Sequence, residues 1–83
     1  NKINVDIDYS NIMVLYDMDN QQKAIEYAAK LRLEGKNVEL VRQSTKHTTD
    51  EYICYAQKMN IMAVVKVLRQ MILNPYMEIY SFG

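Results

Sequence analysis

The sequence predicts a small α/β domain of three layers, with helices covering a mixed sheet and elements in the order β-α-β-α-β-β. Three observations predict this class. Residues 12–16, IMVLY, form a continuous apolar run that is typical of a strand covered on both faces. The stretch from Asp17 to Gly35 has helical periodicity, with a recognisable signal at each end. A second β-type run, from Val38 to Val41, follows directly, so these pieces form one β-α-β unit.

Length and charge limit the broad class of protein. The 83 residues are enough for one domain, and ten basic residues balance ten acidic ones. A neutral chain has no general electrostatic attraction for nucleic acid or an anionic membrane. No apolar run approaches the roughly 20 residues that span a bilayer, and no signal-peptide pattern is present. The single cysteine, Cys54, cannot form an internal disulfide, so we expect a cytoplasmic location. The neutral charge and the lack of a long apolar run lead us to expect no membrane partner.

The first residues differ in pattern from the rest. Ile3, Val5 and Ile7 alternate with polar residues, which fits a short exposed strand, although a linker from a preceding domain fits as well. We therefore assign residues 1–11 as a linker or edge strand and residues 12–83 as the α/β domain. Because the chain begins at Asn1 rather than at methionine, we expect it to be part of a longer polypeptide or to lack a few residues.

The first helix is predicted from its caps and its apolar stripe. Asp19 followed by Gln22 fits a capping box, and Asn20 is an equally good cap. Gly35 is placed where a left-handed C-terminal cap is needed. The stripe consists of Ala24, Ala28 and Leu31, flanked by Ile25 and Tyr27. The small alanines should allow this helix to lie close against the sheet.

The rest of the chain continues the alternation of strands and helices. Thr48 and Glu51 form a second capping box, which opens a helix through about Met59 that Asn60 can end. Residues 62–67 form a third buried strand, residues 68–75 a turn region and residues 77–80 a final strand with one wet face. Strands joined through helices are normally parallel, whereas the short last connection predicts an antiparallel pair. The expected core residues are Ile12, Val14, Ile25, Ala28, Leu31, Val38, Leu40, Ile53, Ala56, Val64 and Val67.

The most enzyme-like feature is Asp17-Met18-Asp19, at the end of the first strand. Carboxylates at the carboxyl end of a parallel strand can hold Mg²⁺ or accept a phosphoryl group. The motif superficially resembles the opening motif of haloacid-dehalogenase-type phosphatases, but Gln21 stands where that family has Thr or Val. The alternative, which we prefer, is structural: Asp19 caps the helix and Asp17 is a solvated turn residue.

A small basic loop follows the second strand. Arg42, Gln43, Lys46 and His47 are the candidate binding residues, because they could grip a phosphate or an RNA backbone. The simpler reading is a polar loop that leads into a helix. His47 and Cys54 provide too few ligands for a metal site, and Cys54 has no partner that would make it catalytic, so we expect no metal, no cofactor and no catalytic residue.

The tyrosines allow two readings. Tyr52, Tyr55, Tyr76 and Tyr80 could stack on bases, but tyrosine is also common in half-buried strands and helices. We favour packing.

A family resemblance covers residues 12–80. The first helix ends in A-x-x-LR-x-x-G, from Ala28 to Gly35, followed by V-E-L; the second contains YA-x-K, from Tyr55 to Lys58, before an apolar strand. These motifs and their spacing resemble the anticodon-binding domain of class IIa aminoacyl-tRNA synthetases, and most closely the histidyl-tRNA synthetase group. The resemblance implies a non-catalytic domain that acts beside the remainder of a synthetase-like chain.

The loop after the second strand departs from that family. Histidyl-tRNA synthetases usually have a glycine and a basic residue there and a lysine-rich helix start, whereas this chain has RQSTKHTTDE, with Asp50 and Glu51 at the helix start. An acidic start is unfavourable for an RNA backbone. The departure argues against tRNA binding and favours resemblance to the synthetase-like regulatory subunit of ATP phosphoribosyltransferase, which acts in histidine biosynthesis. A tRNA-binding domain of a synthetase, and less so a small phosphotransfer enzyme using Asp17, remain as alternatives.

Overall fold

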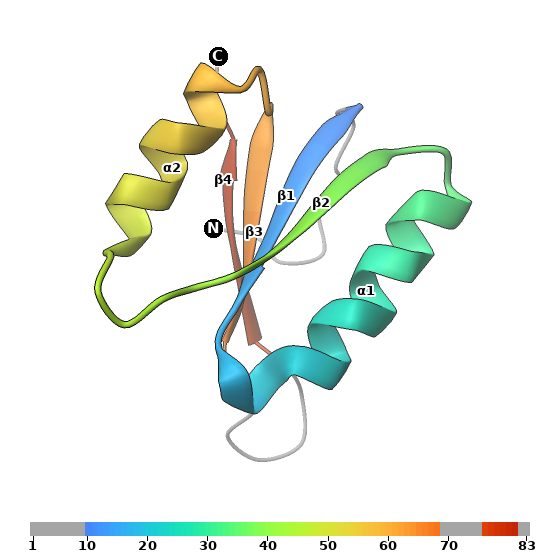
Figure 1. Cartoon of the computed structure of the whole chain (residues 1–83). Helices are drawn as coiled ribbons and strands as arrows, with labels where there is room; N and C mark the ends of the chain where they lie inside the picture. The colour runs from blue at the N-terminus through green and yellow to red at the C-terminus, as the bar shows by residue number, and fades with distance from the viewer. Residues whose placement is uncertain (1–9, 69–75, 82–83) are drawn as a thin grey trace.

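The described residues, 10–68 and 76–81 of the computed structural model, form a mixed β-sheet with a helix on each face (Figure 1). The order along the chain is β-α-β-α-β-β, as predicted, with one short 3₁₀ turn (η1) added before the first helix. The elements are β1 (Asn11–Tyr16), η1 (Met18–Asn20), α1 (Gln21–Leu33), β2 (Asn37–Arg42), α2 (Thr49–Lys58), β3 (Ala63–Leu68) and β4 (Tyr76–Ser81). Within these residues no helix combines the length and the apolar character needed to cross a bilayer.

The strand β1 lies inside the sheet, which has the order β2-β1-β3-β4. It pairs in parallel with both β2 and β3, and β4 pairs antiparallel with β3. The central position of residues 12–16, the parallel pairs and the antiparallel last pair were all predicted and are confirmed. The physical reason is the apolar run itself, because Ile12, Met13, Val14 and Leu15 are buried on both faces of the sheet.

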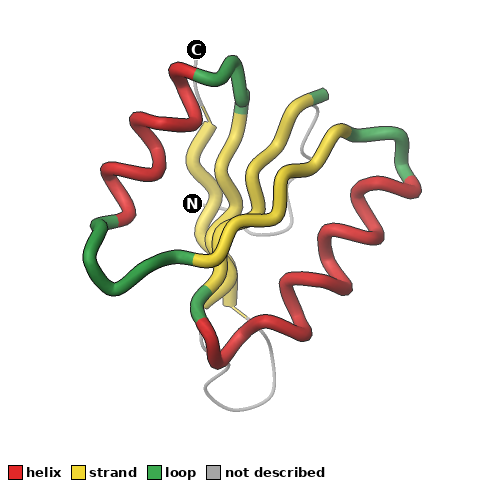
Figure 2. Tube along the Cα trace, in the orientation of Figure 1, coloured by secondary structure: helices red, strands yellow, loops and turns green. Residues whose placement is uncertain are grey.

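The two helices cover opposite faces of the sheet, which confirms the three layers (Figure 2). On the face that we call the α1 face, Ala24, Ala28 and Leu31 pack against Ile12 and Val14 of β1. On the other, the α2 face, Ala56 packs against Met13 and Leu15 of β1 and Val64 of β3. Alternate residues of β1 thus supply both halves of the core.

The predicted core is correct for seven of its members. Ile12, Val14, Ala28, Leu31, Ala56, Val64 and Val67 are buried. Val38 and Leu40 are only half-buried because β2 is at the end of the sheet, and Ile53 is also half-buried. The prediction for Ile25 was wrong: its side chain is 40% exposed, because it is one residue beyond Ala24 and turns away from the sheet. Met13, Leu15, Ala24, Ile61, Ala63 and Val65 are further buried residues.

The start of α1 differs from the predicted capping box. Asn20 is the N-cap residue, and its side chain makes no capping hydrogen bond to the helix. Asp17 caps the preceding 3₁₀ turn instead, since its Oδ1 accepts from the Asp19 amide at 3.2 Å and from Asn20 Nδ2 at 2.8 Å. The predicted role of Asp19 as the helix cap is therefore wrong, and the alternative, Asn20, occupies the N-cap position. Asp17 is an exposed turn residue, as predicted, and its carboxylate also caps the 3₁₀ turn. The other end is as predicted, with Gly35 left-handed at φ 91°.

Two predictions concern segments only partly covered by the described residues. Asn11, assigned to the linker or edge strand, belongs to β1, while residues 1–9 lie outside the described part. Leu68, assigned to the turn region, ends β3, and residues 69–75 also lie outside it.

Candidate functional site

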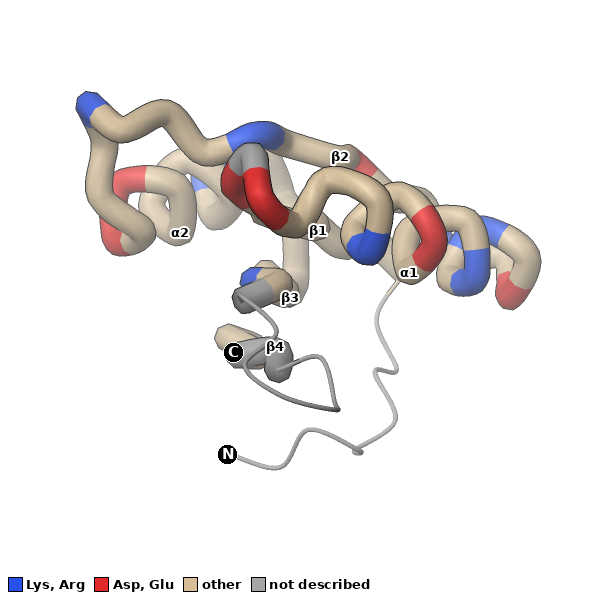
Figure 3. Tube along the Cα trace, turned by 90° about the horizontal axis from the view of Figure 1, so that it is seen from below, with Lys and Arg blue, Asp and Glu red and all other residues tan. Residues whose placement is uncertain are grey.

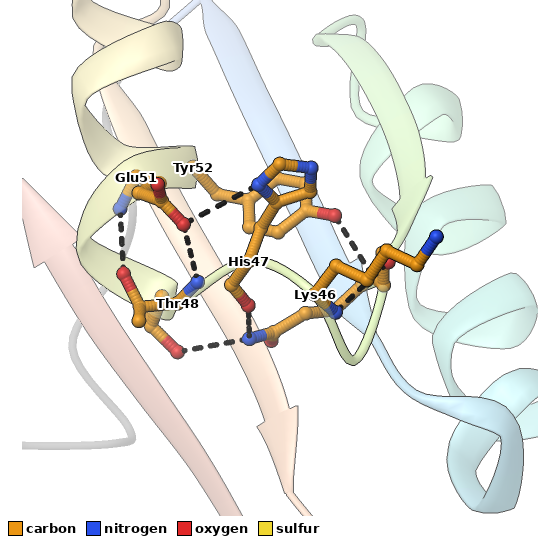
Figure 4. Close-up of polar contacts among 8 residues, drawn as sticks. Lys46, His47, Thr48, Glu51 and Tyr52 are labelled. Atoms are coloured by element: carbon orange, nitrogen blue, oxygen red, sulfur yellow. Dashed lines mark hydrogen bonds and ion pairs between the residues drawn. The ribbon is translucent and has the colours of Figure 1, made fainter.

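The loop between β2 and α2 carries the candidate binding residues, and it is anchored by the N-terminal cap of α2 (Figure 4). Thr48 Oγ1 accepts a hydrogen bond from the Glu51 amide at 3.3 Å, and the Thr48 amide donates to Glu51 Oε1 at 2.7 Å. This is the capping box that the sequence predicts. The hydrogen bond from the Thr48 amide, followed by the interaction with His47, holds the pKa of Glu51 below its ordinary value. Glu51 is therefore a fixed carboxylate at the helix start.

His47 is held by its neighbours in α2. Its Nδ1 lies 3.4 Å from Glu51 Oε1, and its ring meets the ring of Tyr52 edge-on, with centroids 6.2 Å apart. The Tyr52 hydroxyl accepts a hydrogen bond from the Ser44 amide at 2.8 Å. The imidazole is thus held in place by contacts with Glu51 and Tyr52, although it remains exposed to solvent.

Gln43 serves the structure of the same loop. Its amide nitrogen Nε2 donates to the carbonyl of His47 at 3.3 Å and to Thr49 Oγ1 at 3.4 Å. Lys66 Nζ donates to the same Thr49 hydroxyl at 2.6 Å, which ties the loop to β3. Gln43 therefore closes the loop, and its side-chain donors already have partners.

Arg42 and Lys46 are the two candidates that face solvent. Both are exposed, and neither side chain has a hydrogen bond or an ion pair within residues 10–68 and 76–81. The side chain of Lys46 extends away from the capped helix start (Figure 4). The side chain of Arg42 lines a hollow of about 570 Å³ at the carboxyl ends of β1 and β2, together with Asp17 and Asp19.

The four predicted residues do not form one site. Arg42 and Gln43 line the hollow at the strand ends, whereas His47 lines a separate hollow of about 400 Å³ beside α2, and Lys46 lines neither. Basic and acidic positions are interspersed along α1, β2 and the loop (Figure 3). Arg69, which together with Arg42 and Lys46 would make a basic stripe suited to RNA, lies outside the described residues.

The described part of the chain contains no assembled metal or catalytic site that would support the enzymatic alternatives. No group of three or more His, Cys, Asp and Glu side chains there is placed to hold a metal ion. The Oδ1 atom of Asp17 accepts two hydrogen bonds as a turn cap. Cys54 is a free, exposed thiol in α2.

The tyrosines divide into packed and exposed ones. Tyr52 and Tyr80 pack against the core of the α2 face, as the packing reading expects. Tyr55 is exposed, and the side chain of Tyr76 lies outside the described residues.

Sequence reasoning missed the hollow beside α2. It is lined by Glu39, Val41, His47, Glu51, Tyr52 and Tyr55. The alternation in Val38-Glu39-Leu40-Val41 is the only local signal, since it places Glu39 and Val41 on one face of β2. That this face remains open depends on where α2 lies over the sheet, which no local pattern encodes.

Comparison with known proteins gave no match, because no protein-family model, no curated protein and no solved structure is significantly similar to this chain. Function is therefore inferred from the residues and geometry described above, together with the resemblance of the sequence.

Proposed function

We propose that this chain is a non-catalytic, anticodon-binding-like domain of a histidyl-tRNA synthetase-like protein, acting in assembly or regulation. The proposed parent is the regulatory subunit of ATP phosphoribosyltransferase, in cytoplasmic histidine biosynthesis. In this role the domain contacts the remainder of the synthetase-like chain and its assembly partners, and it needs no cofactor.

The fold supports this proposal at the level of architecture. The resemblance implies a three-layer domain with a mixed sheet in the order β-α-β-α-β-β, and the described residues have that order. The residues that carry the resemblance have packing roles: Ala28 and Leu31 lie in the α1 contact, and Ala56 in the α2 contact. Gly35 supplies the left-handed end of α1. These motifs specify a scaffold rather than a reaction.

The observation that carries the proposal is that polar side chains of the β2–α2 loop are already engaged and that carboxylates lie beside them. Gln43 and His47 are engaged in hydrogen bonds and contacts within the loop, and Glu51 is a fixed carboxylate beside His47. Asp17 and Asp19 line the same hollow as Arg42. A phosphate that approached either position would meet a carboxylate, which disfavours binding through the RNA backbone. Contact with protein suits this surface better.

One observation favours a second function, the anticodon-binding domain of a histidyl-tRNA synthetase. Arg42 and Lys46 are exposed and have no side-chain partner in the described residues, so both remain available to phosphates. Phosphate contacts of this kind supply most of the non-specific affinity for nucleic acid and make it sensitive to salt.

A tRNA titration separates the two functions. Fluorescence anisotropy with histidine tRNA at about physiological salt should give only weak, salt-sensitive binding. Lys30→Ala is the matched control, because Lys30 is an exposed lysine on α1, away from the loop. Sub-micromolar, tRNA-specific binding that is lost in Arg42→Ala or Lys46→Ala, but kept in Lys30→Ala, would replace the regulatory function with the synthetase function.

The assembly role needs a second measurement. The full-length protein that carries this chain, mixed with a short-form ATP phosphoribosyltransferase catalytic subunit, should elute from size-exclusion chromatography as a complex. Separate elution of the two proteins at micromolar concentrations would contradict the proposed parent. The sequence upstream of Asn1 provides an independent check, since the proposal requires a class II synthetase-like domain there.

A further inference from the structure

The outer edge of β2 presents backbone groups that no described strand uses. The Asn37 amide donates to the carbonyl of Ser10 at 2.7 Å, and the Gln43 amide donates to that of Tyr16 at 2.6 Å. Odd-numbered residues of β2 therefore direct their backbone groups toward β1, and even-numbered residues direct theirs outward. Within residues 10–68 and 76–81, the N–H and C=O of Leu40 thus point away from the sheet.

One end of this edge is already protected. Arg32 Nη2, from the last turn of α1, donates to the outward carbonyl of Val38 at 2.8 Å. An arginine that caps one carbonyl shortens the edge available to another strand. The open part is centred on Leu40 and extends to Arg42.

A hollow lies directly beside this open edge, on the α2 face. The helix α2 packs over β1 and β3 through Ala56, and Val41 of β2 is only half-buried at the margin of this cluster, so the helix leaves the α2 face of β2 partly open. Glu39 and Val41 of β2 and Tyr55 of α2 line the resulting hollow of about 400 Å³. A smaller hollow of about 250 Å³, lined by Glu39 and Met59, continues it toward the other end of β2. Tyr55 and Met59 are 46% and 53% exposed, so an apolar margin runs along the helix.

The charge in this hollow is negative. Glu39 and Glu51 contribute carboxylates, and no lysine or arginine is among the described residues that line it. Glu51 Oε1 already interacts with the Thr48 amide and with His47. Glu39 is exposed and has no hydrogen bond or ion pair in the described part of the chain. A cationic side chain is the complement that this position lacks.

We propose that the open edge of β2 accepts an extended segment of a partner protein as an added antiparallel strand. The partner residue opposite Leu40 exchanges both backbone hydrogen bonds with it. Its two neighbours then project toward the α2 face, as Glu39 and Val41 do. The segment therefore reads apolar-x-basic: the apolar side chain fills the hollow over Val41 and Tyr52, and a lysine or arginine lies opposite Glu39. This inference rests on the proposed function and names the surface through which assembly occurs.

A peptide of that pattern tests the inference on the whole chain. The probe is acetyl-Ser-Thr-Phe-Thr-Lys-Thr-Ser-amide, titrated into ¹⁵N-labelled protein and followed by NMR. The outward amides of Leu40 and Arg42 and the hollow residues Val41 and Tyr55 should shift together and saturably. Methylating the backbone nitrogen of the threonine between Phe and Lys removes one of the two hydrogen bonds to Leu40 and places a methyl group against the Leu40 carbonyl, so this peptide should not bind.

Charge reversal and a matched variant provide the controls. Glu39→Gln should weaken binding about two- to fivefold, the range of an exposed ion pair, and replacing the peptide lysine by glutamate should weaken it further. Glu34→Gln, an exposed change at the end of α1, should leave the affinity unchanged.

Three outcomes would overturn the inference: no saturable shift at millimolar peptide, equal binding of the N-methylated peptide, or equal affinity in Glu39→Gln. Shifts at Leu40 that depend on protein concentration without peptide would assign the edge to a second copy of the chain, and would also overturn it. Peptide binding without a complex with the ATP phosphoribosyltransferase subunit would reject the proposed parent alone.

Discussion

Ala28 is fully buried where α1 meets the sheet, so Ala28→Leu tests the central contact of the fold. The substitution adds an isopropyl group to a cluster in which Ile12, Val14 and Val65 are themselves almost completely buried. None of these neighbours can move into solvent to make room, and overpacking of this kind costs about 1–3 kcal/mol. A domain of this length has a free energy of unfolding of about 4–12 kcal/mol, so the loss is a substantial fraction.

Urea unfolding followed by circular dichroism measures the effect. With a slope of about 1 kcal/mol per M, at the low end of the range for small proteins, the midpoint should fall by about 1–3 M. Ala29→Leu is the matched control: the same change one residue along the same helix, at an exposed position. Alanine and leucine are both good helix formers, so its midpoint should barely move. Equal midpoints for the two variants would show that α1 does not meet the sheet through Ala28.

Three further predictions concern the ends of the helices and one half-buried tyrosine. Gly35→Ala should lower the free energy of unfolding by about 1–3 kcal/mol, because the backbone of Gly35 is left-handed at φ 91°. The space around Gly35 is open, so the cost comes from the backbone and not from a steric clash. An unchanged urea midpoint would contradict this. The pKa of Glu51 is below its ordinary value of 4.5, so the stabilisation from this carboxylate is present above that pH and is lost as the pH falls through the lowered pKa. Urea midpoints of Glu51→Gln should therefore fall less than those of the unaltered chain below about pH 4.5, and parallel pH profiles would refute the stabilising role of the Glu51 carboxylate. Burial, and then the Glu34 carboxylate, raise the pKa of Tyr27 above 10.0, so its contribution to stability is present below that pH and is lost as the pH rises through the raised pKa. Thermal melts of Tyr27→Phe should lose less stability at alkaline pH, and an identical loss would show that Tyr27 is not responsible.

The sequence by itself determined the order of elements and the central place of β1. The run from Ile12 to Tyr16 is apolar throughout and is too short for a typical helix, which favours a strand covered on both faces. The capping box of Thr48 and Glu51 was also predictable, because a cap depends on residues three apart and on no distant contact. Gly35 was predictable for the same local reason.

Local competition explains the errors at the start of α1. Asp17, Asp19 and Asn20 are all good caps, and the sequence does not say which of them the chain uses. The structure inserts a 3₁₀ turn that Asp17 caps, and this turn moves the start of the helix to Asn20. The orientation of Ile25 is an error of another kind: it borders the apolar stripe, and only the angle at which α1 meets the sheet directs it to solvent.

Only the tertiary structure decided which polar residues share a site. Arg42, Gln43, Lys46 and His47 are adjacent in sequence, yet the turn into α2 separates them between two hollows and open solvent. The same long-range packing leaves the α2 face of β2 partly open and places Glu39 and side chains of α2 around one hollow. These features depend on contacts between elements distant in the chain, whose relative positions are set by the packing of buried side chains and not by any local pattern.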